Sequence, residues 1–137
     1  MWCHQFLKDC SLEKNVRLVH CPLRRHVIEG VEITCYDLSD GFLQAVLKDD
    51  RPDFVVIDGP AAEPGARFGI LPLVRQFLRP RAWFFMDDAL RDGELRAAQL
   101  LSQLPYVRVD GVYLVGKGLL VGQVGEGTDD SVSHPQH

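Results

Sequence analysis

The sequence contains no apolar stretch of about 18 residues, so no segment is suited to cross a membrane as a helix. Its opening decapeptide, MWCHQFLKDC, also lacks the apolar centre of a secretory signal peptide. The 4 cysteines form no CxxC motif, which favours free thiols over disulfides or a zinc site. We therefore expect a cytoplasmic protein that does not bind membranes.

An excess of positive charge is missing as well. The 15 Lys and Arg residues are outnumbered by 19 Asp and Glu residues, which gives a net charge of -4. A nucleic-acid partner held by phosphate contacts requires a basic stripe. The motif PLRRH at 22–26 is only a small basic cluster. We expect no nucleic-acid partner.

What the chain does have is enough apolar content for one core. At 137 residues and 46% hydrophobic composition, it is predicted to form a single domain. Apolar residues almost disappear in the final stretch, GEGTDDSVSHPQH. We therefore predict an ordered domain over 1–123 and a disordered tail over 124–137.

Two apolar runs that end in acid are the most informative part of the sequence. They are DFVVIDGP at 53–60 and AWFFMDDAL at 82–90. Continuous Val, Ile and Phe without period-two alternation is typical of strands covered on both faces of a parallel sheet. Asp58, Asp87 and Asp88 would then lie at strand carboxyl ends, where open α/β sheets bind their ligands.

The remaining elements alternate between helices and strands, as expected for an α/β fold with right-handed crossovers. The 16–20 stretch, VRLVH, is a strand candidate, and the last apolar region is predicted to be an antiparallel hairpin. Helices are predicted over about ten residues from Ser39 or Asp40, over 70–78, and over 91–104.

These motifs in this order resemble the class I S-adenosylmethionine-dependent methyltransferases, and within them the small-molecule O-methyltransferase-like branch. The resemblance rests on VRLVHCPL, FVVIDGP, Arg67 and LVRQFLRPRAWFFMDDALRDGE, and covers roughly residues 2–123. It implies a partial Rossmann-like sheet, mostly parallel with a C-terminal antiparallel hairpin, that lacks the family's first two strands.

The part of the family pattern that grips the cofactor is absent from this sequence. In the family, a first strand leads into a glycine-rich turn, and a second strand ends in an acid. The first glycine here is Gly30, which follows no strong strand signal. We therefore expect an amino-terminally truncated fragment, inactive alone, whose exposed sheet edge favours a homodimer.

The resemblance also implies roles for individual residues. Asp58, Asp87 and Asp88 would hold Mg²⁺ or another divalent cation, and Asp58 and Asp88 would be catalytic by orienting and acidifying a hydroxyl of a small-molecule methyl acceptor. Cys21, Pro22 and Asp58 would contact S-adenosylmethionine, and Arg67 would hold an acidic group of the substrate.

Each of these interpretations has an alternative. The three acids are also consistent with ordinary solvated strand ends, and a surface position is the more common environment for an arginine such as Arg67. A phosphoacceptor receiver domain shares the acid set but places the acid pair before the single acid. The stronger competing hypothesis is a non-enzymatic remnant of the fold that serves as an interaction module.

Overall fold

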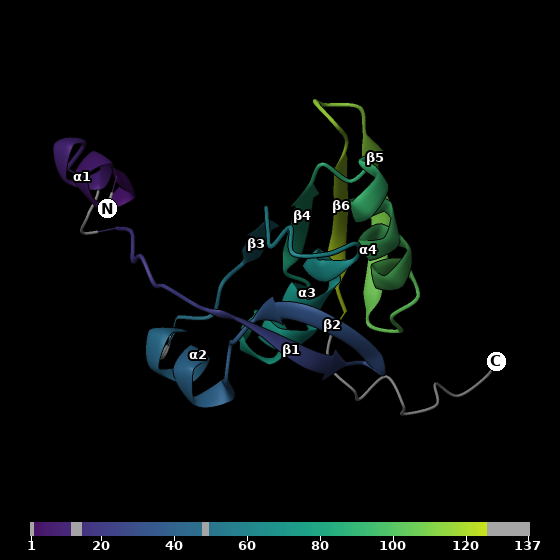
Figure 1. Cartoon of the computed structure of the whole chain (residues 1–137), viewed down its shortest axis with the longest axis horizontal. Helices are drawn as coiled ribbons and strands as arrows, with labels where there is room; N and C mark the ends of the chain where they lie inside the picture. Colours follow the sequence, from purple (N-terminus) through teal and green to yellow (C-terminus); the bar gives the residue numbers. More distant parts are fainter. Residues whose placement is uncertain (1, 12–14, 48–49, 126–137) are drawn as a thin grey trace.

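The computed structural model describes residues 2–11, 15–47 and 50–125. Helix α1 stands at one end of the molecule, and the extended segment 15–22 joins it to the rest (Figure 1). The elements in chain order are α1 (Trp2–Asp9), β1 (Leu23–Ile28), β2 (Val31–Tyr36), α2 (Asp40–Leu47), β3 (Phe54–Ile57), η1 (Ala66–Gly69), α3 (Ile70–Val74), η2 (Arg75–Phe77), β4 (Trp83–Asp87), α4 (Asp92–Ser102), β5 (Val107–Tyr113) and β6 (Leu119–Val124).

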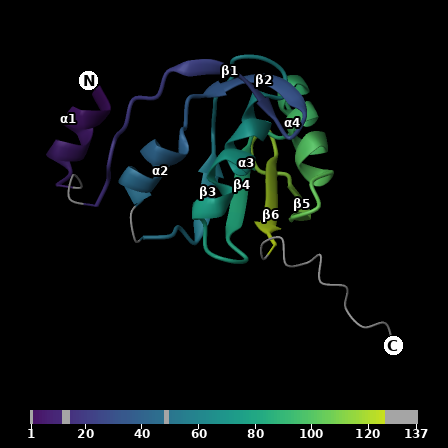
Figure 2. The same cartoon turned by 90° about the horizontal axis from the view of Figure 1, so that it is seen from below.

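A four-stranded sheet in the order β3-β4-β6-β5 forms the centre of the fold (Figure 2). Strands β3 and β4 are parallel neighbours, and β5 and β6 form an antiparallel hairpin in the same sheet, as the sequence predicts. The expectation of a mostly parallel sheet is wrong for the described residues, because β4 pairs with β6 in the antiparallel sense. The sheet is mixed, with one parallel pair.

The predicted strand at 16–20 is not formed. That segment is extended but unpaired, and its Val16, Leu18 and Val19 side chains are exposed. Instead, β1 and β2 form a separate two-stranded antiparallel hairpin. Its two-residue turn, Glu29 and Gly30, has φ values of 51° and 77°, the backbone geometry of a type I′ turn. A strand needs a partner, and no described strand lies beside 16–20.

The helices agree more closely with the sequence. Ser39 caps α2 by accepting a hydrogen bond at Oγ from the N–H of Phe42, at 3.2 Å. The helix expected over 70–78 is divided into α3 and η2, with Pro72 in the first turn of α3. None of the helices in the described part of the chain is long and apolar enough to cross a membrane.

The core lies on one side of the four-stranded sheet. Phe84 and Met86 of β4 are fully buried against Leu71 of α3 and Leu101 of α4. A Cβ atom on Gly122 would come within 2.6 Å of the Phe84 ring. The glycine therefore lets this ring lie flat against β6, which ties the two central strands together.

The expected end of the domain lies one residue before the end of β6, since that strand includes Val124. The tail expected from 124 onward falls mainly on residues 126–137, which lie outside the described residues.

Candidate functional site

Three acids gather where β3 and β4 end. The parallel register pairs Ile57 with Met86, which places Asp58 beside Asp87 at the carboxyl end of the sheet. Asp58, Asp87 and Asp88 each offer a carboxylate oxygen, and these atoms all lie within 4.8 Å of one another. The structure therefore brings together the three acids that the sequence predicts to meet.

The backbone after β4 explains how two consecutive acids reach the same place. Successive side chains of a strand point to opposite faces. Asp88 has a φ of 55°, in the left-handed region that non-glycine residues seldom adopt. Its N–H donates to Oδ1 of Asp87 at 2.8 Å. This turn breaks the strand alternation and lets both carboxylates approach Asp58.

A buried arginine lies against the acids. Arg67 comes from the short helix η1 and is only 4% exposed. Its Nη1 donates to the carbonyl oxygen of Asp87 at 2.8 Å, and lies 3.8 Å from Asp58 Oδ1 and 3.9 Å from Asp88 Oδ2. The surface position favoured for this residue is wrong. Its guanidinium supplies positive charge to the acid cluster.

Glu94 is a site residue that the sequence does not reveal. It lies in the first turn of α4, where an acid is expected for the helix dipole alone. Its side chain is 8% exposed, and Oε1 lies 3.6 Å from Nε of Arg67. Glu94 Oε2 and Arg67 Nε have no hydrogen-bond partner. Arg67 thus has carboxylates on both sides: those of Asp58 and Asp88 in the acid cluster, and the buried carboxylate of Glu94.

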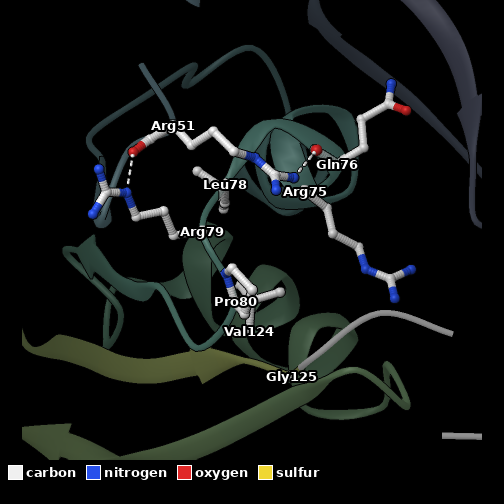
Figure 3. A pocket seen from close by; sticks show the side chains of 8 residues that line it. All are labelled: Arg51, Arg75, Gln76, Leu78, Arg79, Pro80, Val124 and Gly125. Carbon is white, nitrogen blue, oxygen red and sulfur yellow. Dashed lines mark hydrogen bonds between the residues drawn. The ribbon is translucent and has the colours of Figure 1, made fainter. Parts of the chain in front are cut away.

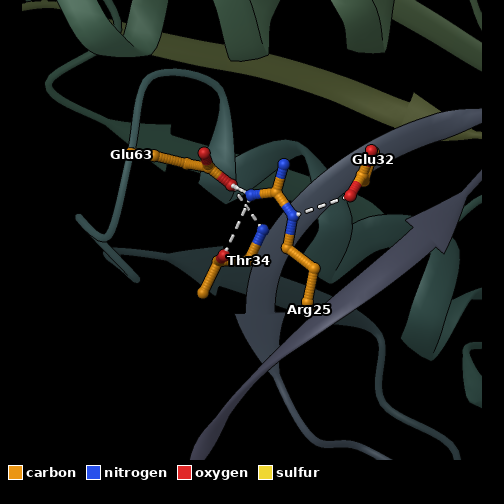
Figure 4. A network of polar contacts seen from close by, with 4 residues as sticks. All are labelled: Arg25, Glu32, Thr34 and Glu63. Carbon is orange, nitrogen blue, oxygen red and sulfur yellow. Dashed lines mark hydrogen bonds and ion pairs between the residues drawn. The ribbon is translucent and has the colours of Figure 1, made fainter.

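The loop that follows Asp58 is fastened to the β1–β2 hairpin by a polar network (Figure 4). Glu63 accepts hydrogen bonds from the backbone N–H of Thr34 and from Arg25 Nη1, the latter at 2.7 Å. Arg25 also donates to Glu32 at 3.2 Å. These contacts lower the pKa of Glu63, first through the Thr34 N–H and then through Arg25. The hairpin therefore fixes the loop that carries Asp58.

Cys21 and Pro22, expected at a cofactor site, precede β1 rather than follow a strand. The Pro22 carbonyl accepts the N–H of Asp37 at 2.8 Å. Burial, and then the charge of Asp37, raise the pKa of the Cys21 thiol. Tyr36 at this end of the hairpin lies against the residue that follows Asp58, because a Cβ on Gly59 would come within 2.8 Å of Tyr36 Oη. Neither Cys21 nor Pro22 makes a described hydrogen bond or ion pair with the three acids.

An open cavity of about 440 Å³ lies beside the acids, lined by Leu90, Arg91, Asp92, Gly116 and Lys117. Arg91 joins it to the cluster, since its Nη2 lies 3.0 Å from Asp88 Oδ2. Its volume is within the range of small-molecule sites. Its wall carries two cationic residues, Arg91 and Lys117, and one acid, Asp92.

A second cavity, of about 380 Å³, is lined by three arginines near the amino ends of β3 and β4 (Figure 3). Their guanidinium groups point in different directions. Arg51 donates to the Gln76 carbonyl at 2.8 Å, Arg79 donates to the Arg51 carbonyl at 3.1 Å, and Arg75 lies 3.6 Å from the centroid of the Tyr106 ring. The described contacts of these arginines are structural, so the acid end remains the candidate site.

No known protein family and no curated protein match the sequence. Among solved structures, a methyltransferase from Geobacter sulfurreducens is similar, with a TM-score of 0.47 and 23% sequence identity. The similarity covers 60% of this chain and 40% of that protein. The chain therefore spans less than half of the length of this neighbour, and the likeness assigns no activity to it.

Proposed function

We propose that this chain is part of an S-adenosylmethionine-dependent methyltransferase that transfers a methyl group to a hydroxyl of a small molecule with the help of a divalent cation. The observation that carries the proposal is the convergence of Asp58, Asp87 and Asp88 within 4.8 Å at the end of two parallel strands. The motifs IDGP and MDDA, which carry these acids, support the same reading through their resemblance to O-methyltransferases.

The acid cluster fits a hard cation. Mg²⁺, Mn²⁺ and Ca²⁺ prefer oxygen ligands at about 2.0 to 2.6 Å, so two ligands of one ion can be separated by up to about 5 Å. The separation of 4.8 Å or less among the three acids satisfies this limit. The cation would have to compete for Asp88 with Arg91 and Arg67. We therefore expect modest affinity.

Within this proposal the residues have separate tasks. Asp58 and Asp88 would be the catalytic residues, because their carboxylates would hold the cation. Asp87 would be the third ligand. A bound cation supplies Lewis acidity, which lowers the pKa of an acceptor hydroxyl. Arg67 was expected to bind substrate, but its burial favours a positioning role, in which it holds the acids through the Asp87 carbonyl. The acceptor would lie in the cavity beside Arg91 and Lys117.

The fit to S-adenosylmethionine is incomplete. The first glycine of the chain, Gly30, closes the β1–β2 hairpin and forms no cofactor turn. Cys21, Pro22 and Asp58 remain the candidate cofactor contacts. We expect this chain alone to bind S-adenosylmethionine weakly or not at all.

A second candidate function, that of a non-enzymatic interaction module, is favoured by Arg67. Like charges brought together need a counter-charge. The Arg67 guanidinium already provides one at 3.8 Å from Asp58 and 3.9 Å from Asp88. If the arginine alone neutralises the acids, no cation is required, and the cluster becomes a structural feature.

A metal titration separates the two functions. Mn²⁺ is titrated into the chain by calorimetry, and melting temperature is followed with and without the ion. We expect saturable binding and a raised melting temperature, both lost in Asp58→Asn. Asp53→Asn is the matched control, because Asp53 lies just before β3 at the opposite end of the strand and is similarly exposed, at 73% against 69% for Asp58. Equal behaviour of both variants, or no binding by the wild type, would support the interaction module.

A further inference from the structure

One face of the four-stranded sheet carries an apolar surface without a described partner. Directly paired residues point to the same face, so the register defines its rows. Phe54 lies beside Trp83, and Val56 lies beside Phe85. Phe85 pairs in turn with Val121 of β6. We call Phe54, Val56, Trp83, Phe85 and Tyr113 the open face.

The open face is exposed to solvent although its residues are of core type. Phe54 is 59% exposed, Val56 61%, Trp83 39% and Tyr113 49%. The opposite face is completely different, since Phe84 and Met86 there are 0% exposed beneath the helices. Parallel strands are almost always covered on both faces. The open face is therefore suited to contact another apolar surface.

The rings on the open face already form part of a packed layer. Phe54 and Phe85 meet edge to face, with centroids 6.2 Å apart and planes at 81°. The row through Val56, Phe85 and Val121 contains no charged residue and continues to Gly111 on β5. A second copy of the same face would meet no like charge along this row.

The area is sufficient for a weak symmetric dimer. The three aromatic residues that are 39% to 59% exposed leave about 300 Å² on the open face if a whole aromatic side chain contributes about 200 Å². Val56, at 61% exposed, raises this to about 400 Å² per copy, and so to about 800 Å² for two copies. The partly buried Phe85 and the rim bring the total close to the roughly 1,000 Å² that a specific interface requires.

Pairing through the free edge of β3 would not cover the open face. Strand β3 is an edge strand of the sheet, and an antiparallel pair of β3 strands would satisfy its backbone. However, the resulting sheet would present two open faces side by side, still in water. Packing face to face at the usual sheet separation of about 10 Å covers both at once.

We propose that two copies of this chain form a two-fold symmetric dimer by packing their open faces together. The contact is apolar and small, so the dimer dissociates in the micromolar range. The interaction is isologous, which means that Trp83 of each copy packs against the open face of the other. The surface borders the acid cluster, because Asp87 follows Phe85 on the same face of β4 and pairs with Leu119, the partner of Tyr113. The dimer itself does not depend on the proposed methyl transfer.

Sedimentation velocity between about 1 and 100 µM, a range that spans micromolar dissociation constants, tests the proposal. We expect a monomer–dimer equilibrium and a concentration-dependent blue shift of Trp83 emission, measured in a Trp2→Phe background. Trp83→Lys and Val56→Lys should each weaken the dimer by about tenfold or more, because each buries a charge. Val56 is 61% exposed, so its lysine variant should fold as the wild type does, as checked by circular dichroism.

The matched controls are two apolar residues that are more exposed than Val56 and lie outside the open face. Val27 on β1 is 74% exposed and Leu114 after β5 is 87% exposed. Val27→Lys and Leu114→Lys should leave the equilibrium unchanged. A wild type that stays monomeric throughout this range would overturn the proposal and leave the face to another polypeptide. A dimer that survives Trp83→Lys would also overturn it, since the contact would then lie elsewhere, for example at the β3 edge.

Discussion

Removal of the Arg67 side chain should destabilise the protein far more than removal of any nearby exposed arginine. In Arg67→Leu the Glu94 carboxylate, whose side chain is 8% exposed, loses its counter-ion at 3.6 Å. Breaking a buried ion pair by removing one partner costs about 3 to 5 kcal/mol. The contact with Asp58 adds little, since that side chain is 69% exposed and its charge is screened by water.

Chemical denaturation with urea measures this cost directly. A loss of about 3 to 5 kcal/mol corresponds to a fall in melting temperature of roughly 12 to 20 °C for a domain of this size. Arg91→Leu is the control: its ion pair with Asp88 is shorter, at 3.0 Å, but Arg91 is 44% exposed, and such pairs contribute about 0 to 1 kcal/mol. If the distance between the charges, rather than their burial, determined the loss of stability, Arg91→Leu would be the more destabilised of the two variants.

A double substitution isolates the buried charge. Arg67→Leu combined with Glu94→Leu removes both members of the pair, and apolar replacements of buried ion pairs are often close to neutral. We expect the double variant to recover most of the stability lost in Arg67→Leu. A loss below about 1 kcal/mol in the single variant would refute the reasoning, because a buried Glu94 without its arginine costs more than that.

Two further predictions concern titratable groups. Because the pKa of Glu63 is lowered in the folded chain, Glu63 contributes to folding stability above its unfolded pKa of about 4.3, and this contribution is lost as pH falls below that value. Glu63→Gln should therefore flatten this part of the curve of stability against pH. An unchanged curve would contradict the network with Arg25. Burial raises the pKa of Cys35 to about 11, so at pH 8 a thiol reagent followed by mass spectrometry should label exposed Cys10 and leave Cys35 unmodified until urea is added; equal labelling of both would show that the packing around Cys35 opens readily.

The acid-tipped strands could be predicted because local and tertiary signals agree there. The apolar runs of β3 and β4 indicate strands, although the prediction that both faces are covered is wrong, since Phe54 and Val56 are exposed. Parallel pairing carries Asp58 and Asp87 to the same edge. The sequence is equally clear for α4, where periodic apolar residues follow an acidic first turn. In these segments propensity, pattern and topology favour the same structure.

Other features depend on contacts that no local pattern contains. The 16–20 stretch has β-forming residues but no strand beside it, so it stays unpaired. Gly30 allows the positive φ of the real hairpin turn, but Glu29, at a φ of 51°, departs from the Asn-Gly and Asp-Gly pairs that usually signal such a turn. The burial of Arg67 could not be predicted, because it results from the packing of η1 against α4 and β2, with Glu94 of α4 on the other side of the guanidinium.

The position of β6 has a consequence for how this protein is made. It is the last strand of the described chain, yet it lies between β4 and β5 and pairs with both. A nascent chain that has left the ribosome only as far as residue 118 therefore has two strands without the neighbour that joins them. Such a chain exposes unpaired edges while synthesis continues at about 5 to 20 residues per second. Closure of the sheet must wait for the ribosome to release β6, so a stop codon shortly before Leu119 should yield a product that is degraded or held by chaperones.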